Sequence, residues 1–313
     1  MTNIHDIAKK SGVSASTVSR VLNGKNYVAN STRLAVEAAM KELNYVPNDI
    51  ARDLSHGRNY NVGVILPHTK HPYFTQILSG IIASSFESDY RVVILPSQYN
   101  ESVEIDYLEQ LRRKAFDALI FISHEISLDK ITEYSQYGRI VVCENPNRED
   151  VFAVYSKRRT TYLEAFKWLK SQQIEQVAVL LSRDYASSVT SQITLDAYQS
   201  IFTKLPNNDL LFETVTTFQD GYEAAQTIIK QQLNVQCIFT NGDDVAAGVV
   251  QAYQAHQKTP PLVIGQENQL SGQLLNIPTI NHHFDKLGRQ ALELVTGAGE
   301  MQQVVIESDF IIR

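Results

Sequence analysis

The sequence predicts an all-helical N-terminal head followed by a larger α/β body that contains two doubly wound subdomains. Three short amphipathic patterns with helical spacing fill residues 3–45. From residue 61 onward, continuous apolar runs alternate with longer amphipathic patterns. Because those runs lack polar alternation, they are typical of strands buried on both faces of a parallel sheet. At 313 residues, the chain is long enough for both parts.

Residues 3–22 predict two short helices joined by a tight turn. Asn3 caps the first helix together with Asp6, which follows at capping-box spacing, and Gly12 ends it. Ser14 caps the second helix. Six apolar residues at helical spacing are expected to face the core of the head: Ile4, Ile7, Ala8, Val18, Val21 and Leu22. Two helices joined by a glycine-containing turn describe a helix-turn-helix.

A third helix is expected over residues 31–44, and a short fourth one over residues 48–55. The apolar stripe predicted for the third helix consists of Leu34, Ala35, Ala38, Ala39 and Leu43. Pro47 ends this helix. An eight-residue helix is marginal in water on its own. We therefore divide the N-terminal part into a head, residues 1–46, and a hinge helix with linker, residues 47–60.

The body, residues 61–313, contains seven predicted strands with six predicted helices between them. The strands are expected at residues 62–66, 91–95, 117–122, 139–143, 176–181, 235–239 and 261–265. The helices are expected at residues 73–88, 101–114, 159–172, 190–203, 220–232 and 243–257. In doubly wound sheets, ligands bind where the carboxyl ends of the strands face a cleft. The sequence therefore predicts a ligand cleft at these strand ends.

Several classes of protein are excluded by what the sequence lacks. It has no P-loop, no G-x-G-x-x-G, no G-x-S-x-G and no H-E-x-x-H motif, so we expect neither an enzyme nor a cofactor. Cys143 and Cys237 lie in apolar runs and are expected to be reduced core thiols. No apolar stretch reaches the ~18 residues of a membrane span. The N-terminus lacks the apolar core of a signal peptide, so the expected location is the cytoplasm.

Two pairs of adjacent residues suggest chemistry but also have structural explanations. Neighbouring side chains point apart on a strand, so we place His282 and His283 at a subdomain crossover or at the surface rather than in a metal site. Asp243 and Asp244 follow a strand and begin a helix, where the helix dipole favours acidic side chains. A hydrogen bond from a ligand to Asp243 is compatible with that position.

Charge is distributed unevenly along the chain. Residues 1–58 carry eight Lys and Arg residues against five acids, which gives a net charge of +3. The formal net charge of the whole chain is −6, so the remainder carries −9. A basic head on an acidic body is compatible with a nucleic-acid partner for the head.

The second helix of a helix-turn-helix lies in the major groove, with its N-terminal residues toward the base edges. Arg20 is the only side chain on that helix that can bind guanine O6 and N7 together; the alternative is a solvated surface cation. The short polar residues around it suit phosphate contacts. The complete set of DNA contacts predicted in the head is Asn3, Ser14, Ala15, Ser16, Thr17, Ser19, Arg20, Asn23 and Thr32.

The predicted hinge helix adds a second set of DNA contacts. Leu54 can enter a minor-groove step and kink the duplex, unless it packs on the body instead. Ala51, one turn earlier, allows close approach to the groove, and Arg52 can reach a phosphate. Asn48 completes this set.

The segments DIAKKSGVSASTVSRVLNG and LNYVPNDIARDLS resemble the head and hinge helix of the LacI/GalR family of transcription regulators. This resemblance covers nearly all of residues 3–56. In the body, VGVILPHTKHPYFTQILSGI resembles the first strand of the family and its effector-contacting turn, and FTNGDDVAAGVV and VIGQENQ resemble later cleft loops. Three further segments look closest to the catabolite-control branch of the family: HPYFTQILSGI, SQYNESVEIDYLEQLRRK and YGRIVVCEN.

The resemblance implies a homodimeric repressor of carbohydrate-utilisation or catabolite-control genes on a palindromic, double-stranded DNA operator. The body would be a periplasmic-binding-protein-like pair of subdomains that closes on a small effector. We expect one subdomain at about residues 61–156 plus 283–300, and the other at about 157–281 plus 301–313. The residues expected to ring the effector are His71, Tyr73, Phe74, Ser123, Thr194, Asp243 and Glu267.

Several positions depart from the family pattern and bear on the effector. His68 and His71 stand where many members have Asp and Asn around the first cleft turn. Thr194 stands where many sugar-responsive members have an arginine, Ser156 where an acid is expected, and Glu267 where a G-x-D loop has its aspartate. Loss of the guanidinium removes bidentate capture of a carboxylate or of vicinal hydroxyls. The effector is therefore either a small sugar-like molecule or a phosphocarrier protein that docks on the body.

Two other possibilities are not favoured by the sequence. A sugar-modifying enzyme that has acquired a head would need a nucleophile, paired carboxylates or metal ligands, and no such group stands out. A sugar phosphate would need a cation in the cleft, and only Lys70, Lys157, Arg158 or the histidines could supply one. Tight binding of a sugar phosphate is therefore not expected.

Overall fold

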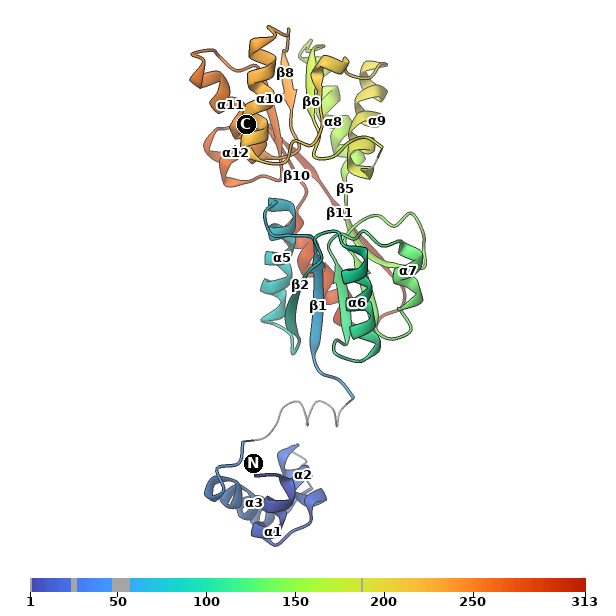
Figure 1. Cartoon of the computed structure of the whole chain (residues 1–313), viewed down its shortest axis with the longest axis vertical. Helices are drawn as coiled ribbons and strands as arrows, with labels where there is room; N and C mark the ends of the chain where they lie inside the picture. The colour runs from blue at the N-terminus through green and yellow to red at the C-terminus, as the bar shows by residue number, and fades with distance from the viewer. Residues whose placement is uncertain (1, 24–26, 47–56, 187) are drawn as a thin grey trace. The chain divides into compact units, whose positions relative to one another are not determined.

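The computed structural model describes residues 2–23, 27–46, 57–186 and 188–313. The chain forms two compact units, residues 1–60 and residues 61–313 (Figure 1). The predicted hinge helix and its four contact residues, Asn48, Ala51, Arg52 and Leu54, lie outside the described residues.

Three helices make up the described part of the head: α1 (Ile4–Ser11), α2 (Ala15–Leu22) and α3 (Asn30–Glu42). The side chain of Asn3 accepts hydrogen bonds from the backbone N–H of His5 and Asp6, and the Asp6 carboxylate accepts the Asn3 N–H at 2.9 Å. Gly12 ends α1 with a left-handed φ of 70°. Ser14 caps α2 by accepting the Thr17 N–H. The predicted helix-turn-helix is therefore confirmed, with its caps.

The apolar stripe predicted for α3 is wrong in part: Ala39 and Leu43 pack in the core of the head as predicted, but the other three residues do not. Leu34 is 58% exposed, and Ala35 and Ala38 are exposed as well. The face that packs on α1 and α2 instead consists of Val36, Ala39, Met40 and Leu43. Both stripes satisfy helical spacing, and the observed one buries Val36 and Met40 together in place of Leu34 and two alanines. The tertiary contacts with α1 and α2 decide between the two stripes.

Replacement of Val36 by alanine is expected to destabilise the head by about 1–3 kcal/mol, because it leaves a cavity in a small core. Amide hydrogen exchange in α1 and α3 of the full-length protein should become faster. The matched Leu34→Ala variant removes an exposed side chain and should leave exchange unchanged. Equal effects of the two substitutions would contradict the phase of α3 described above.

Six parallel strands form the first sheet of the body, in the order β11-β5-β4-β3-β1-β2. The strands are β1 (Asn61–Leu66), β2 (Arg91–Pro96), β3 (Ala118–Phe121), β4 (Arg139–Val142), β5 (Phe152–Lys157) and β11 (Gln303–Glu307). One face packs on α5 (Pro72–Ser85) and α13 (Phe284–Thr296). The other face packs on α6 (Glu101–Arg112) and α7 (Leu128–Glu133).

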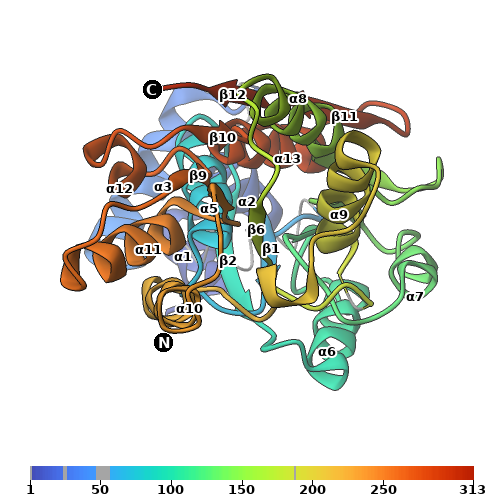
Figure 2. The ribbon, with the colours of Figure 1, turned by 90° about the horizontal axis from the view of Figure 1, so that it is seen from above.

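The second sheet has the order β12-β10-β9-β8-β6-β7, and β12 alone runs antiparallel to its neighbour. The strands are β6 (Val177–Leu180), β7 (Leu211–Phe212), β8 (Cys237–Phe239), β9 (Leu262–Gln266), β10 (Thr279–Asn281) and β12 (Asp309–Ile311). Figure 2 shows α8 (Arg158–Ser171) and α9 (Val189–Phe202) on one side of this sheet, and α10 (Phe218–Lys230) and α11 (Asp243–Ala255) on the other. A short α12 (Leu270–Leu274) follows β9.

The predicted assignment of residues 301–313 to the second subdomain is wrong in part. β11 pairs with β5 in the first sheet, and only β12 lies in the second. Five strands and three helices were not predicted: β5, β7, β10, β11, β12, α7, α12 and α13. Several of these strands are very short or lie at sheet edges, where one face stays exposed and no continuous apolar run forms. Cys143 and Cys237 are buried and unpaired, as predicted.

The chain crosses between the two sheets three times. It leaves β5 for α8, returns from β10 to α13, and passes finally from β11 to β12 (Figure 1). Because β5 and β10 both end at these crossings, the carboxyl ends of the parallel strands in both sheets face the cleft between them. No helix in the described ranges is long and apolar enough to span a membrane.

The helices α5 and α13 approach so closely that glycine is needed at their crossing. A Cβ atom on Gly80 would lie 1.9 Å from the carbonyl oxygen of Asp285. A Cβ atom on Gly288 would lie 2.0 Å from the carbonyl oxygen of Ile77. The first subdomain therefore depends on a backbone-to-backbone contact between elements far apart in the sequence.

Candidate nucleic-acid interface and interdomain cleft

The exposed face of α2 gathers several of the predicted DNA contacts. The Ser14 hydroxyl lies 2.8 Å from the Ser16 hydroxyl and 2.9 Å from the Thr17 hydroxyl at the N-terminus of α2. Arg20 is exposed on the same helix, and its guanidinium lies 6.0 Å from the centre of the Tyr27 ring. Tyr27 was not predicted, although an exposed aromatic residue next to the recognition helix can orient a cation.

The remaining head residues of the predicted set lie around this face. Asn3 is committed to the cap of α1, and the Asn23 side chain donates to the Ser19 hydroxyl at 3.4 Å. Ala15 and Thr32 are half-buried at the starts of α2 and α3. The exposed face of α2 therefore presents short hydroxyl groups and the Arg20 guanidinium, a combination suited to phosphates and a guanine edge.

In the cleft, the first wall begins with the turn after β1. His71 caps α5 by accepting the Tyr73 N–H at 3.1 Å, and burial together with nearby positive charge lowers the pKa of His71 to about 4. Phe74 is buried against the edges of His68 and His71. The Tyr73 hydroxyl can donate to the carbonyls of Ile122 and Cys143, so it is already used within the first subdomain. These residues supply a neutral, largely aromatic surface.

His124 follows β3 and lies beside Ser123, whose hydroxyl donates to the Tyr99 hydroxyl at 3.4 Å. The His124 Nδ1 is 2.6 Å from the Ile126 carbonyl, and Nε2 is 2.7 Å from Oε1 of Glu144. Both partners are acceptors, so both ring nitrogens carry hydrogen and the ring is an imidazolium. Burial lowers the pKa of His124, but the hydrogen bond and charge of Glu144 outweigh burial and raise the pKa overall.

The raised pKa of His124 predicts a pH-dependent contribution to stability. This contribution is present below the ordinary pKa of 6.5 and is lost as the pH rises through the folded-state pKa above it. Glu144→Gln should lower the pKa of His124, measured from its ring resonances in an NMR titration. The same substitution should flatten the dependence of the unfolding free energy on pH above 6.5. A wild-type pKa at or below 6.5 would contradict the imidazolium assignment.

Glu267 lies on the second wall directly after β9 and is only 6% exposed. Its φ of 82° is unusual for a residue with a side chain, and such strain concentrates at functional sites. The carboxylate accepts a hydrogen bond from the Gln269 side chain and lies 3.9 Å from Nδ1 of His71. Burial raises the pKa of Glu267 well above its ordinary value, and the positive charge of Arg158 opposes that rise.

Two of the predicted cleft residues are used inside the second subdomain. Asp243 is fully buried and accepts the Gln269 N–H at 2.6 Å and the Thr279 hydroxyl at 2.7 Å. Asp243 therefore positions the loop that carries Glu267 rather than offering a free oxygen to the cleft. Thr194 is buried in α9, and its hydroxyl donates to the carbonyl of Thr190 in the same helix. Asp243 does begin α11, as predicted.

Two arginines that were not placed among the cleft residues lie against the first wall. The Arg158 guanidinium lies 5.7 Å from the centre of the Tyr73 ring and 5.3 Å from that of Phe284. The Arg183 guanidinium lies 5.4 Å from the centre of the Tyr99 ring. The sequence offered Arg158 only as one of several possible cations for a sugar phosphate, beside Lys70, Lys157 and the histidines, and Arg183 was not predicted.

A buried network of hydrogen bonds around His282 joins residues from all three crossovers. The Ser308 hydroxyl lies 3.0 Å from Nδ1 of His282, and the Ser156 hydroxyl donates to the His282 carbonyl at 2.8 Å. Nε2 of His282 is 3.0 Å from Oε1 of Gln266, the residue before Glu267. Burial lowers the pKa of His282 well below its ordinary value, so the ring is neutral. His282 therefore lies at a crossover, as predicted. Within the described ranges, no cluster of three or more potential ligands could hold a metal.

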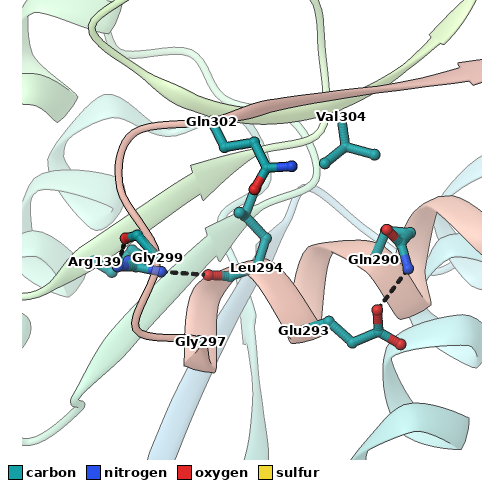
Figure 3. A pocket seen from close by; sticks show the side chains of 8 residues that line it. All are labelled: Arg139, Gln290, Glu293, Leu294, Gly297, Gly299, Gln302 and Val304. Carbon is teal, nitrogen blue, oxygen red and sulfur yellow. Dashed lines mark hydrogen bonds between the residues drawn. The ribbon is translucent and has the colours of Figure 1, made fainter.

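The body has a hollow at the margin of the cleft and another at the end of α13. One, of about 330 Å³, lies at the cleft margin and is lined by Thr75, Gln76, Ser79, Glu267, Asn268, Asn281 and Asp285. The other, of about 200 Å³, lies at the C-terminal end of α13 (Figure 3). There the Arg139 guanidinium donates to the carbonyls of Leu294 and Gly299, so its donors are used by the fold. Only the first hollow belongs to the cleft.

Residues 3–48 match the family described as bacterial regulatory proteins, lacI family. Residues 59–312 match the periplasmic binding proteins and sugar binding domain of the LacI family. The chain belongs to the LacI family. This LacI-family protein is a DNA-binding transcription regulator and not an enzyme. The predicted resemblance is therefore confirmed over the head and the body.

The LacI-family chain is similar to several characterised relatives. It is 36% identical to catabolite control protein B of Bacillus subtilis (strain 168) over 94% of each protein. It is 26% identical to the ribose operon repressor of Escherichia coli (strain K12), over 94% of this chain and 92% of the repressor. Its fold matches a lac repressor dimer bound to operator and the anti-inducer ONPF with a TM-score of 0.81 and 18% identity, over 99% and 97% of the two chains.

Proposed function

We propose that this LacI-family regulator represses carbohydrate-utilisation or catabolite-control genes in the cytoplasm, through a palindromic DNA operator. The observation that carries the proposal is the exposed face of α2, where Arg20 stands beside a cluster of hydroxyl groups. The 36% identity to catabolite control protein B supports the class of genes. We assign DNA contact to Asn3, Ser14, Ala15, Ser16, Thr17, Ser19, Arg20, Asn23, Thr32, Asn48, Ala51, Arg52 and Leu54.

The operator and the genes are tested by selection of bound genomic fragments with the full-length protein. The bound fragments should share a palindrome and lie upstream of genes for carbohydrate uptake or metabolism. Repetition of the selection with hexoses, pentoses and a phosphocarrier protein distinguishes the two proposed kinds of effector. Recovery of fragments without a common motif would overturn the proposal.

The body supports a homodimer through an exposed apolar surface on one side. Phe86, at the end of α5, is 85% exposed, and Leu274 in α12 is 76% exposed. The same group of exposed apolar side chains includes Ile82, Ile94, Phe218, Leu270 and Leu275. Figures 1 and 2 both place α5, β2, α10 and α12 on the same side of the body. We infer that a second copy of the chain would bury these side chains.

The dimer is tested by sedimentation equilibrium of the full-length protein. Phe86→Asp and Leu274→Asp should each shift the protein toward the monomer and weaken binding to a palindromic site more than to a half-site. Leu205 is exposed outside this surface, so Leu205→Asp is the matched control and should leave the dimer intact. A monomeric wild-type protein at micromolar concentration would overturn the assignment.

For the effector, we propose that a small sugar-like molecule binds in the cleft among His71, Tyr73, Phe74, Ser123 and Glu267, with Thr194 and Asp243 behind them. Aromatic rings on the first wall and a buried acceptor on the second suit a polyol ring. A ligand there can change operator affinity only through a difference in affinity for two states of the body. The alternative effector, a phosphocarrier protein docked on the body, requires no ligand in the cleft.

A further inference from the structure

The cleft contains two guanidinium groups without a carboxylate partner. Throughout the described part of the chain, no carboxylate oxygen lies within 4.0 Å of a side-chain nitrogen of Arg158 or Arg183. Both groups come from the second subdomain and lie against tyrosines of the first. Arg158 is half-buried, so it has lost part of its hydration without gaining an ion pair.

The two arginines flank a continuous part of the first wall. Arg158 lies over Tyr73, whose hydroxyl reaches the carbonyl of Ile122. The next residue, Ser123, donates to the hydroxyl of Tyr99, and Arg183 lies over that ring. A ligand at the carboxyl ends of β1 to β3 would therefore lie beside both guanidinium groups. Each guanidinium offers a planar fork of N–H donors that matches the oxygens of a phosphate or carboxylate.

Within the described ranges, the acidic groups of the cleft form no ion pair with these guanidinium groups, although Glu267 and Arg158 attract each other. Oε1 of Glu144 lies 2.7 Å from Nε2 of the His124 imidazolium. Asp243 is buried, and its carboxylate accepts hydrogen bonds from Gln269 and Thr279 instead of facing the cleft. Glu267 remains as an acceptor, held by Gln269 and separated from Arg158 by more than an ion-pair distance. The site therefore combines two cationic groups with one buried acceptor for a hydroxyl.

We propose that the cleft binds a polyol that carries an oxyanion, with Arg158 and Arg183 on the oxyanion and Glu267 on a hydroxyl group. The proposal rests on the effector role of the cleft put forward above, and it names the class of ligand. It reverses the sequence-based expectation that a sugar phosphate does not bind tightly, and it selects Arg158 from the cations that the sequence offered. Arg158, at the start of α8, supplies the guanidinium that is missing at Thr194.

Isothermal titration calorimetry of the full-length protein tests the proposal. The probes are a panel of hexoses and pentoses, their phosphates, the corresponding sugar acids, and inorganic phosphate. At least one phosphate or sugar acid should bind ten times or more tightly than its neutral sugar and than inorganic phosphate. The phosphate and acid arms then distinguish the two sources of the oxyanion.

Variants identify the residues responsible. Arg158→Gln and Arg183→Gln should each abolish most of the preference for the anionic ligand, and Arg158→Lys should restore only part of it. Arg183 is exposed, so its replacement keeps the test valid if Arg158→Gln fails to fold. Lys157 is exposed one position earlier and pairs with Glu307, so Lys157→Gln is the matched control and should keep the preference.

The possible outcomes separate this proposal from the proposed function. Equal binding of a sugar and its phosphate, or an unchanged preference in both arginine variants, overturns the oxyanion site but keeps the cleft as the effector site. Binding by no member of the panel also overturns it and favours a protein effector. Selection of operator fragments without ligand depends on the head, so it still tests the regulator function separately.

Discussion

Replacement of Arg20 by alanine is expected to weaken binding to the selected operator by about 1–3 kcal/mol. Binding to unrelated DNA of the same length should change much less. The reason is that Arg20 is exposed on α2 beside Tyr27 and is the only side chain of that helix that can form two hydrogen bonds with one guanine. Fluorescence anisotropy with operator and random duplexes at several salt concentrations measures both affinities.

The control for this prediction is Lys41→Ala, which removes the same charge from the exposed end of α3. It should affect operator and random DNA similarly and only slightly. If Arg20 contacts a phosphate instead, the variant should weaken both duplexes alike and reduce the salt dependence of binding by about one counterion. That result would remove Arg20 from the role of reading a base.

Gly288→Val is expected to destabilise the first subdomain by at least about 3 kcal/mol, because its Cβ would meet the backbone of α5. The carbonyl of Ile77 would lie 2.0 Å from that Cβ, and a backbone atom cannot move aside as a flexible side chain can. Urea unfolding of the full-length protein, followed by circular dichroism, should show an early transition.

Gly299→Val is the matched control, since no atom lies within 4 Å of the position of its added Cβ. This substitution should leave the unfolding midpoint close to that of the wild type. Similar midpoints for the two variants would mean that α5 and α13 can separate at little cost. The close crossing would then not be a main source of stability in the first subdomain.

The features that the sequence predicts well are those that depend on neighbouring residues. The caps at Asn3, Gly12 and Ser14 involve partners within five positions along the chain, and the structure confirms them. The central strands of both sheets are buried on both faces, so each appears as an apolar run. Such local signals are sufficient for the helix-turn-helix and for two parallel sheets.

The features that could not be predicted depend on contacts between distant segments. The sequence of α3 allows two apolar faces, and only the packing of Val36 on the other helices shows which of them is buried. The position of Asp243 at a strand end was predicted, but the direction of its carboxylate is set by Thr279 and by the loop after β9. Arg158 was one of several cations that the sequence offered for the cleft, and only the path of the chain, which brings α8 against Tyr73, selects it.

The three crossings of the chain also fix the order in which a nascent chain can complete its subdomains. Lys157 and Glu307 lie opposite each other in β5 and β11, yet they are 150 residues apart. While the ribosome synthesises the second subdomain, the first still lacks α13, and the apolar face that includes Ile77 and Ile81 remains uncovered. This exposed face makes the half-made chain a candidate for chaperone binding. The first subdomain is synthesised first, but it cannot finish folding until the second subdomain has been synthesised as well.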